Sequence, residues 1–140
     1  MADYKFGLEL NLPLDEADAR VRAVLKTEGF GVLTEIDVQA TLKDKLGVDV
    51  SPERILGACN PRLAHMAMEV EPGAAVLLPC NVVLRESGPG KTEILFLDAE
   101  QALRLIGNPA LEPIAKEASQ RLRRAARMLA DDATPVEGGQ

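Results

Sequence analysis

The chain has 140 residues, of which 46% are hydrophobic and 27% charged, with a formal net charge of −6. This length suits a single domain with one hydrophobic core, and the apolar content is too high for a disordered chain. Nucleic-acid binding depends on Lys and Arg side chains that neutralise phosphates, so this acidic chain is not expected to bind nucleic acid. No apolar run is long enough for a membrane span, and the first residues do not form a secretory signal. Two cysteines indicate a reduced, cytoplasmic protein rather than a disulfide scaffold.

The first half of the chain predicts alternating strands and helices. Residues 4–11 alternate apolar and polar side chains, as a half-buried strand does. Residues 13–28 predict an amphipathic helix that Gly29 ends. Residues 31–37 predict a second strand, and Asp37 is placed to cap a short helix through Lys45. A third strand over 54–59 leads into Asn60-Pro61, a typical start for a helix, here through Glu69. The apolar stripe of the first helix consists of Leu14, Ala17, Val21, Val24 and Leu25.

The second half predicts a hairpin followed by helices. Residues 75–85 are apolar on both faces, which predicts a covered strand with Pro79 at a bulge or an unpaired position. Residues 86–90 form a hairpin loop, and residues 91–97 return as an antiparallel strand. A helix over 98–106 precedes a long helix that begins at Asn108-Pro109, or only at Pro113, and ends near residue 130. Residues 1–130 are therefore expected to form one α+β domain, with the first and last helices on one face of the sheet. Residues 131–140 are expected to be a disordered acidic tail.

Each of the two cysteines is followed directly by an asparagine, in Cys59-Asn60 and Cys80-Asn81. Free cysteine most often behaves as a small buried hydrophobe, so an inert core role is the simplest interpretation. Cys59, however, ends a strand just before a helix N-terminus, where backbone N–H groups stabilise a thiolate. If Cys80 lies on a neighbouring strand, the pair could oxidise reversibly or bind a soft metal such as Cu(I) or zinc.

Other polar residues give less specific signals. His65, the only histidine, lies one turn into the helix after Cys59 and is a candidate base or third metal ligand. No C-x-x-C or H-x-x-x-H spacing supports a metal site, and a lone helical histidine more often lies at the surface. Glu35 and Asp37 share one face of a strand, the spacing of an acid–base pair, although a solvent-facing Glu35 and a capping Asp37 are simpler roles. No catalytic residue and no cofactor can be assigned.

Four segments together resemble the domain-of-unknown-function 302 family over residues 4–130: GFGVLTEIDVQATLKDKLGV, ILGACNP, LLPCNVVL and NPALEPIAKEASQRLRR. The resemblance implies a TATA-binding-protein-like α+β fold, with a curved, mainly antiparallel sheet, helices on one face and a long C-terminal helix. It also implies a cytoplasmic homodimer without an established activity. Asp37, Asn60 and Pro61 match positions that the family tends to keep. Val38 and Asn81 stand where other members often carry a His and a Lys.

The sequence favours a binding protein over an enzyme, since the resemblance places Val38 where other members have an imidazole. The leading hypothesis is a homodimer with a small-ligand pocket between sheet and helices. The polar lining of this pocket would come from Asp37, Cys59, Asn60, Cys80 and Asn81. One alternative is a thiol redox or soft-metal protein that uses Cys59 and Cys80, with His65 as helper. Another is a structural or partner-binding module. The site hypotheses require the ends of the third and fourth strands to meet, so that both cysteines and the asparagines that follow them share one cavity.

Overall fold

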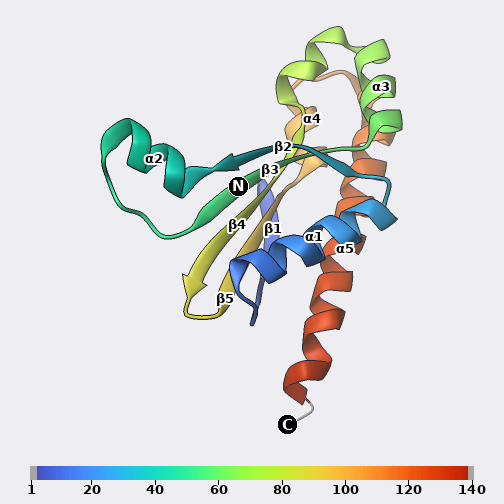
Figure 1. The fold of residues 1–140 in the computed structure, drawn as a ribbon. Coiled ribbons are helices and arrows are strands. Elements are labelled where there is room, and N and C mark those ends of the chain that lie inside the picture. The colour runs from blue at the N-terminus through green and yellow to red at the C-terminus, as the bar shows by residue number, and fades with distance from the viewer. Residues whose placement is uncertain (1–2, 139–140) are drawn as a thin grey trace.

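A five-stranded sheet organises the chain (Figure 1). The structure is a computed structural model that describes residues 3–138, with side chains for residues 3–131. The strands are β1 (Lys5–Leu10), β2 (Gly31–Asp37), β3 (Glu53–Cys59), β4 (Cys80–Gly88) and β5 (Lys91–Leu97). They lie in the order β1-β5-β4-β3-β2, and every neighbouring pair is antiparallel. The expected α+β fold with an antiparallel sheet is confirmed.

Within residues 3–138, five helices and two 3-10 turns connect or follow these strands. They are α1 (Leu14–Thr27), α2 (Val38–Leu46), α3 (Pro61–Val70), η1 (Pro72–Leu77), α4 (Ala99–Arg104), η2 (Pro109–Leu111) and α5 (Glu112–Gly138). Helices α1 and α5 pack on one another and on the sheet, whereas α3, η1 and α4 gather at the end where β3 stops and β4 starts (Figure 1). None of the helices within residues 3–138 is both long and apolar enough to cross a membrane.

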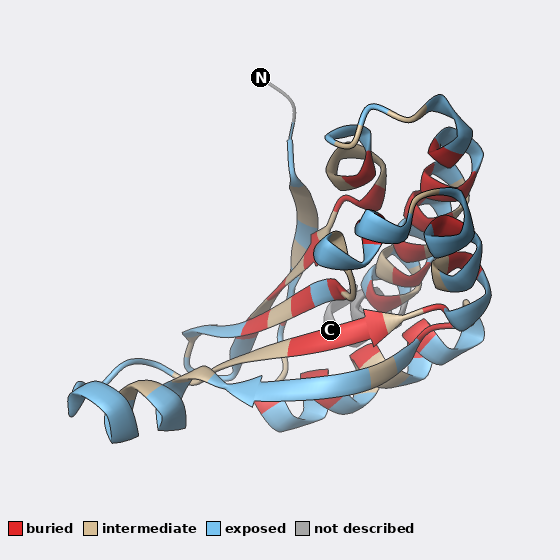
Figure 2. Cartoon of the chain, turned by 90° about the horizontal axis from the view of Figure 1, so that it is seen from above, coloured by how far each residue is buried: buried red, intermediate tan, exposed pale blue. Residues whose placement is uncertain are grey.

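The hydrophobic core lies between one face of the sheet and the helices, as the red residues of Figure 2 show. Alternate residues of each strand point to this face, because side chains alternate along a strand. The inward residues of the central strands are fully buried, and they include Leu56, Val82, Leu84, Ile94 and Phe96. All five residues of the predicted stripe on α1 are buried as well, so the helical period identified this face correctly.

The end of α1 shows how the sequence fixes one junction. Gly29 adopts φ 83°, a conformation that glycine reaches without steric cost. The chain then turns so that the N–H of Phe30 donates to the carbonyl of Leu25 at 3.0 Å. This is the Schellman arrangement, which satisfies carbonyls that the helix end would otherwise leave unpaired. Phe30 becomes buried just before β2 begins.

Ion pairs fasten α1 to the sheet. The guanidinium of Arg54 on β3 lies 2.9 Å from Asp18 and also pairs with Asp15, and Arg22 pairs with Asp18 from the next turn of α1. The side chain of Asp18 is only 9% exposed, whereas that of Asp15 is 84% exposed. Acidic residues in the first turns of a helix are favoured by the helix dipole. In the structure Asp15 and Asp18 also form ion pairs with Arg54 on β3.

The predicted strand over residues 75–85 is wrong in its first half. Residues Pro72–Leu77 form η1, and β4 begins only at Cys80. A short apolar run fits a covered strand and a short helical turn equally well, so periodicity could not separate them. Pro79 lies just before the ladder, in an unpaired position as expected.

The C-terminal helix begins at Glu112 and is assigned through Gly138. Pro113 therefore lies in its first turn, where the missing N–H of proline has no intrahelical partner to lose. The disordered tail expected over residues 131–140 stays a prediction. Side chains after Asp131, and residues 139–140 altogether, lie outside the part of the chain that the structure describes.

Candidate functional site

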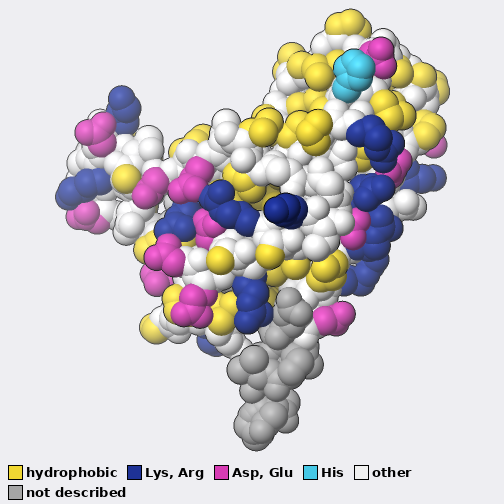
Figure 3. All heavy atoms as spheres, turned by 45° about the vertical axis from the view of Figure 1, so that its right-hand side comes forward, with side chains coloured by type: hydrophobic (Ala, Val, Ile, Leu, Met, Phe, Trp, Pro, Cys, Tyr) yellow, Lys and Arg dark blue, Asp and Glu magenta, His cyan; other side chains and the backbone are white. Residues whose placement is uncertain are grey.

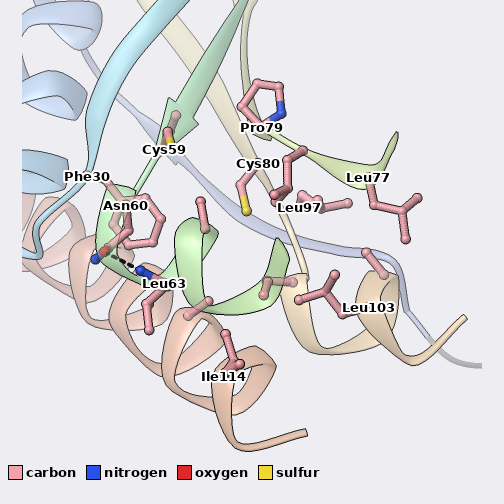
Figure 4. Close-up of a pocket in the computed structure, with 17 residues that line it drawn as sticks. Phe30, Cys59, Asn60, Leu63, Leu77, Pro79, Cys80, Leu97, Leu103 and Ile114 are labelled. Atoms are coloured by element: carbon pink, nitrogen blue, oxygen red, sulfur yellow. Dashed lines mark hydrogen bonds between the residues drawn. The ribbon is translucent and has the colours of Figure 1, made fainter. Parts of the chain in front are cut away.

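The ends of β3 and β4 meet, as the site hypotheses require. Ala58, the second-last residue of β3, lies opposite Cys80, the first residue of β4. Cys59, the last residue of β3, and Cys80, the first residue of β4, therefore lie on neighbouring strands at the same end of the sheet. Helix α3 follows β3 after a single residue, Asn60, and η1 leads into β4. These connections cover the strand ends and enclose a pocket (Figure 4).

The pocket has a volume of about 30 Å³ and walls that are almost entirely apolar. Three of the predicted site residues, Cys59, Asn60 and Cys80, line it, and Figure 4 shows the sulfur of Cys80 turned toward its interior. The remaining walls come from the turn before β2, from α3, from the segment before β4, from the end of β5, from α4 and from α5. These residues are Phe30, Ala58, Leu63, Ala64, Ala67, Leu77, Leu78, Pro79, Leu97, Ala99, Ala102, Leu103, Ile114 and Ala118.

Asn60 is a structural junction, and both polar atoms of its side chain bond within the chain. Its Oδ1 accepts from the N–H of Leu63 at 3.2 Å and so caps α3. Its Nδ2 donates to the carbonyl of Glu28 at 3.3 Å, which ties the cap to the end of α1. Among the described side chains, no buried nitrogen or oxygen lacks a hydrogen-bond partner. The pocket therefore presents no unsatisfied polar atom to a ligand.

The two thiols are neutral at physiological pH. Burial, with a further contribution from the nearby Cys59, raises the pKa of the Cys80 thiol to about 11. Burial also raises the pKa of Cys59, which is half-buried. The register adds a geometric constraint: Ala58 shares a face with Cys80, so alternation directs the side chain of Cys59 toward the other face of β3. Both observations work against thiolate chemistry, since the thiolate is the nucleophile and the metal ligand.

Gly57 allows side chains to pack closely against the end of β3 on the sheet face away from the helices. A β-carbon at Gly57 would lie 2.8 Å from Cγ of Pro79 and would collide with Oγ1 of Thr34. Only glycine allows Pro79 and Thr34 to approach the backbone of β3 this closely. The pocket is consequently backed by packed side chains on the face away from the helices.

Asp37 and Asn81 lie outside the pocket. Asp37 pairs in register with Arg54, whereas Gly31, at the opposite end of β2, pairs with Cys59. Its carboxylate accepts from the N–H of Ala40 at 2.9 Å, so it caps α2 as the sequence predicted. Asn81 is exposed on the sheet face that the helices leave open.

His65 also lies outside the pocket and away from the thiols. It is exposed on α3, with its Nε2 3.9 Å from a carboxylate oxygen of Glu69. Within residues 3–131, whose side chains are described, no three His, Cys, Asp or Glu side chains are placed to hold a metal ion.

The sequence missed most of the wall of the pocket. Leu77 was assigned to a strand, although it belongs to η1, and Leu103 carried no signal beyond a helical core position. Ile114 and Ala118 lie on α5, and nothing in the sequence of that helix separates a pocket wall from ordinary core. Only the relative placement of segments that are distant in the sequence creates the pocket.

The fold and the pocket define a small α+β protein with an apolar cavity at one end of an antiparallel sheet. The sequence pattern of the family described as "Domain of unknown function DUF302" matches residues 6–129, and the chain belongs to this family. A solved structure titled as the crystal structure of uncharacterized conserved protein DUF302 from Bacillus stearothermophilus is similar, with a TM-score of 0.82 and 29% identity. The match covers 90% of this chain and 98% of that chain. No curated protein shows significant sequence similarity to the chain.

Proposed function

We propose that this chain is a cytoplasmic, homodimeric binding protein that takes a small apolar ligand into the pocket at the ends of β3 and β4. The observation that carries the proposal is the pocket itself, with the thiol of Cys80 at its interior and hydrocarbon elsewhere. Ligand sites are concave and mostly apolar, and they lie at junctions between elements. The pocket joins strand ends to α3, α4 and α5 and fits this description.

The lining sets the chemical class of the ligand. Asn60 is satisfied within the chain and Cys80 holds a neutral thiol, so the interior offers neither a charge nor a free strong hydrogen-bonding group. A volume of about 30 Å³ holds two or three water-sized groups. We therefore expect the two or three terminal carbons of an aliphatic chain to enter. Any polar part of the ligand would remain at the mouth.

The thiol redox and soft-metal alternative has less support. It needs a thiolate at neutral pH, and burial moves the pKa of both thiols upward. His65, the proposed helper, does not line the pocket. The partner-binding alternative does have a specific observation in its favour, because large apolar side chains such as Leu46, Val76 and Leu105 are 69%, 85% and 80% exposed. Within this proposal, exposed apolar surface is covered by a second copy of the chain.

The cytoplasmic part of the proposal depends on the two free cysteines. Free thiols persist in the reducing cytosol, whereas secreted proteins of this size usually oxidise them to disulfides.

A matched pair of variants tests the pocket. Ala102→Leu fills it from α4, whereas Ala75→Leu adds the same side chain to an exposed position of η1 outside the pocket. Hexan-1-ol and hexanoate serve as probes, with thermal unfolding and calorimetric titration as readouts. At about ten times the dissociation constant, a bound probe should raise the Tm of the wild type by about 5 °C. Ala75→Leu should keep this shift and Ala102→Leu should lose it. Equal shifts in both variants would assign binding to the surface instead and contradict the proposal.

A further inference from the structure

Helix α3 exposes a group of metal-binding side chains that the pocket does not use. The side chains of His65 and Glu69 are 72% and 67% exposed. Met66 and Met68 are 38% and 39% exposed, although methionine more often fills gaps in a hydrophobic core. In Figure 3 the cyan imidazole of the only histidine stands on the surface, among yellow side chains and beside an acidic one.

The helical spacing places Met68 beside His65 and turns Met66 to another side. Residues three and four apart are neighbours on the surface of a helix, with Cβ atoms about 5–6 Å apart. Met68 follows His65 by three positions on α3, and Glu69 follows it by four. Met66 is the next residue after His65, so it lies about 100° around the helix from it.

The two methionines also differ in the charge that they meet. The sulfur of Met66 lies 3.7 Å from Nη1 of Arg62, so a positive charge already faces it, although Arg62 also pairs with Glu117 on α5. Met68 makes no hydrogen bond or ring contact with any residue whose side chain is described. The charged residue that follows it on the helix is Glu69. A cation is therefore more favoured at Met68 than at Met66.

Glu69 serves His65 in a way that is common at metal sites. One of its carboxylate oxygens lies 3.9 Å from Nε2 of His65. This separation is longer than a hydrogen bond, yet the carboxylate favours a proton on the ring nitrogen that faces it. Metal-bound histidines usually direct one ring nitrogen at such an acceptor and bind the metal through the other. Nδ1 of His65 then keeps its lone pair for a metal ion.

This pair of donors selects a soft monovalent cation. A thioether is a soft, neutral ligand that selects Cu(I), and imidazole also binds copper. Zinc needs four ligands, or three and a water, and within residues 3–131 no three His, Cys, Asp or Glu side chains are placed to supply them. A thioether has no proton to lose, so the raised pKa values of the two thiols do not bear on this donor set.

We propose that His65 and Met68 form a surface site for one Cu(I) ion, with Glu69 orienting the imidazole and adding negative charge. Ag(I) belongs to the same class of soft cation and serves as a probe that does not change its oxidation state. The site is on the outer side of α3, whereas Leu63 and Ala67 on the inner side are buried and line the pocket. Metal binding here does not depend on the apolar ligand, so either proposal can fail without the other.

Calorimetric titration of untagged protein with silver nitrate in chloride-free buffer tests the site. The parent protein carries Cys59→Ala with Cys80→Ala, because thiols bind Ag(I) more tightly than thioethers do, and circular dichroism checks its folding. The parent should bind one Ag(I) per chain, and His65→Ala and Met68→Leu should each weaken this binding at least about tenfold. Met66→Leu is the matched control, since it makes the same change at an almost equally exposed methionine, and it should keep the affinity of the parent.

Nuclear magnetic resonance of the wild type gives a second readout that does not need the cysteine variants. The methionine methyl groups are isotope-labelled, and Ag(I) is added beyond the amount that the thiols take up. The methyl signal of Met68 should then shift together with the ring signals of His65, while the methyl signal of Met66 stays in place. If the cysteine-free parent does not fold, these shifts decide the question alone.

Three results would overturn the proposal. Unchanged affinity in Met68→Leu would exclude the thioether as a ligand. An equal loss of affinity in Met66→Leu, or equal shifts of both methyl signals, would mean that Ag(I) binds this helix without a defined site. Absence of binding to the folded parent, with the methyl signal of Met68 unmoved in the wild type, would show that the donors do not act together.

Discussion

Cys80 begins a strand of the sheet, lines the pocket and has a raised pKa. It starts β4, it is 6% exposed, and its sulfur lies among hydrocarbon. Transfer of a thiolate into such surroundings is unfavourable, so the folded state retains the proton to a higher pH than the unfolded chain does. The neutral thiol serves packing and contact with an apolar ligand better than nucleophilic attack.

This retention of the proton predicts how stability depends on pH. The pKa of Cys80 is about 11 in the folded state, whereas the pKa of an unfolded thiol is about 8.5. Between these values the folded state binds more protons than the unfolded state, so the free energy of unfolding falls as pH rises. The contribution is complete below the unfolded pKa, is lost on passing about pH 11, and is on the order of 3 kcal/mol. Urea unfolding of wild type and Cys80→Ala across this range measures it. Parallel pH profiles for the two proteins would contradict the assignment.

At the scale of elements, two residues predicted to cap helices have different surroundings. Asn60 caps α3 and also binds the carbonyl that ends α1, and it is 8% exposed. Asp37 caps α2, a helix with no buried residue. The sequence identified both caps from residue type and position. It could not show that one of them joins two helices of the core.

A pair of alanine substitutions measures this difference. Asn60→Ala removes a cap and leaves buried backbone groups without partners, and should lower the free energy of unfolding by about 1–3 kcal/mol. Asp37→Ala frays a helix that the core does not use, and should cost less than about 0.5 kcal/mol in protein too dilute to dimerise. Chemical denaturation of both variants provides the comparison. Equal losses would mean that α2 unfolds together with the core.

The sequence predicted most elements and little of their arrangement. Periodicity located α1 and its buried stripe, and turn residues located Gly29 and the β4–β5 hairpin, because these signals are local. The run before Pro79 was misassigned because four apolar residues carry no period. Asp37 was grouped with Cys59 and Cys80 on residue type, although the register of β2 separates them. Pairing across strands follows from tertiary packing, which residue type alone does not encode.

At the scale of the whole molecule, α1 connects the two edges of the sheet. It follows β1 at one edge and precedes β2 at the other, and it crosses the face of the strands between them. Ion pairs of Asp15 and Asp18 with Arg54 therefore attach this crossing helix to β3, the strand next to the β2 edge. At the β1 edge, the rings of Phe6 on β1 and Phe96 on β5 stack with their centroids 5.2 Å apart, which stabilises the pairing of these two strands.

Two conservative substitutions separate the buried from the exposed part of this attachment. Asp18→Asn removes the charge that faces two arginines in a largely buried position, and should cost about 1–3 kcal/mol of unfolding free energy. Asp15→Asn changes an exposed partner of the same arginine, and should cost about 0.5 kcal/mol or less. Thermal and urea unfolding at low and high salt measure both. If Asp15→Asn proved as costly as Asp18→Asn, burial would not be the property that matters.

The strand order also governs what the protein can do while it is being made. Both outer strands, β1 and β2, are synthesised before any strand with which they pair, and the partner of β1 is complete only at Leu97. In a nascent chain β1 therefore stays without a partner strand until most of the sequence has left the ribosome. Helix α1, which follows β1, is synthesised long before that point. Chains that terminate before β5 would leave β1 unpaired and ready to aggregate.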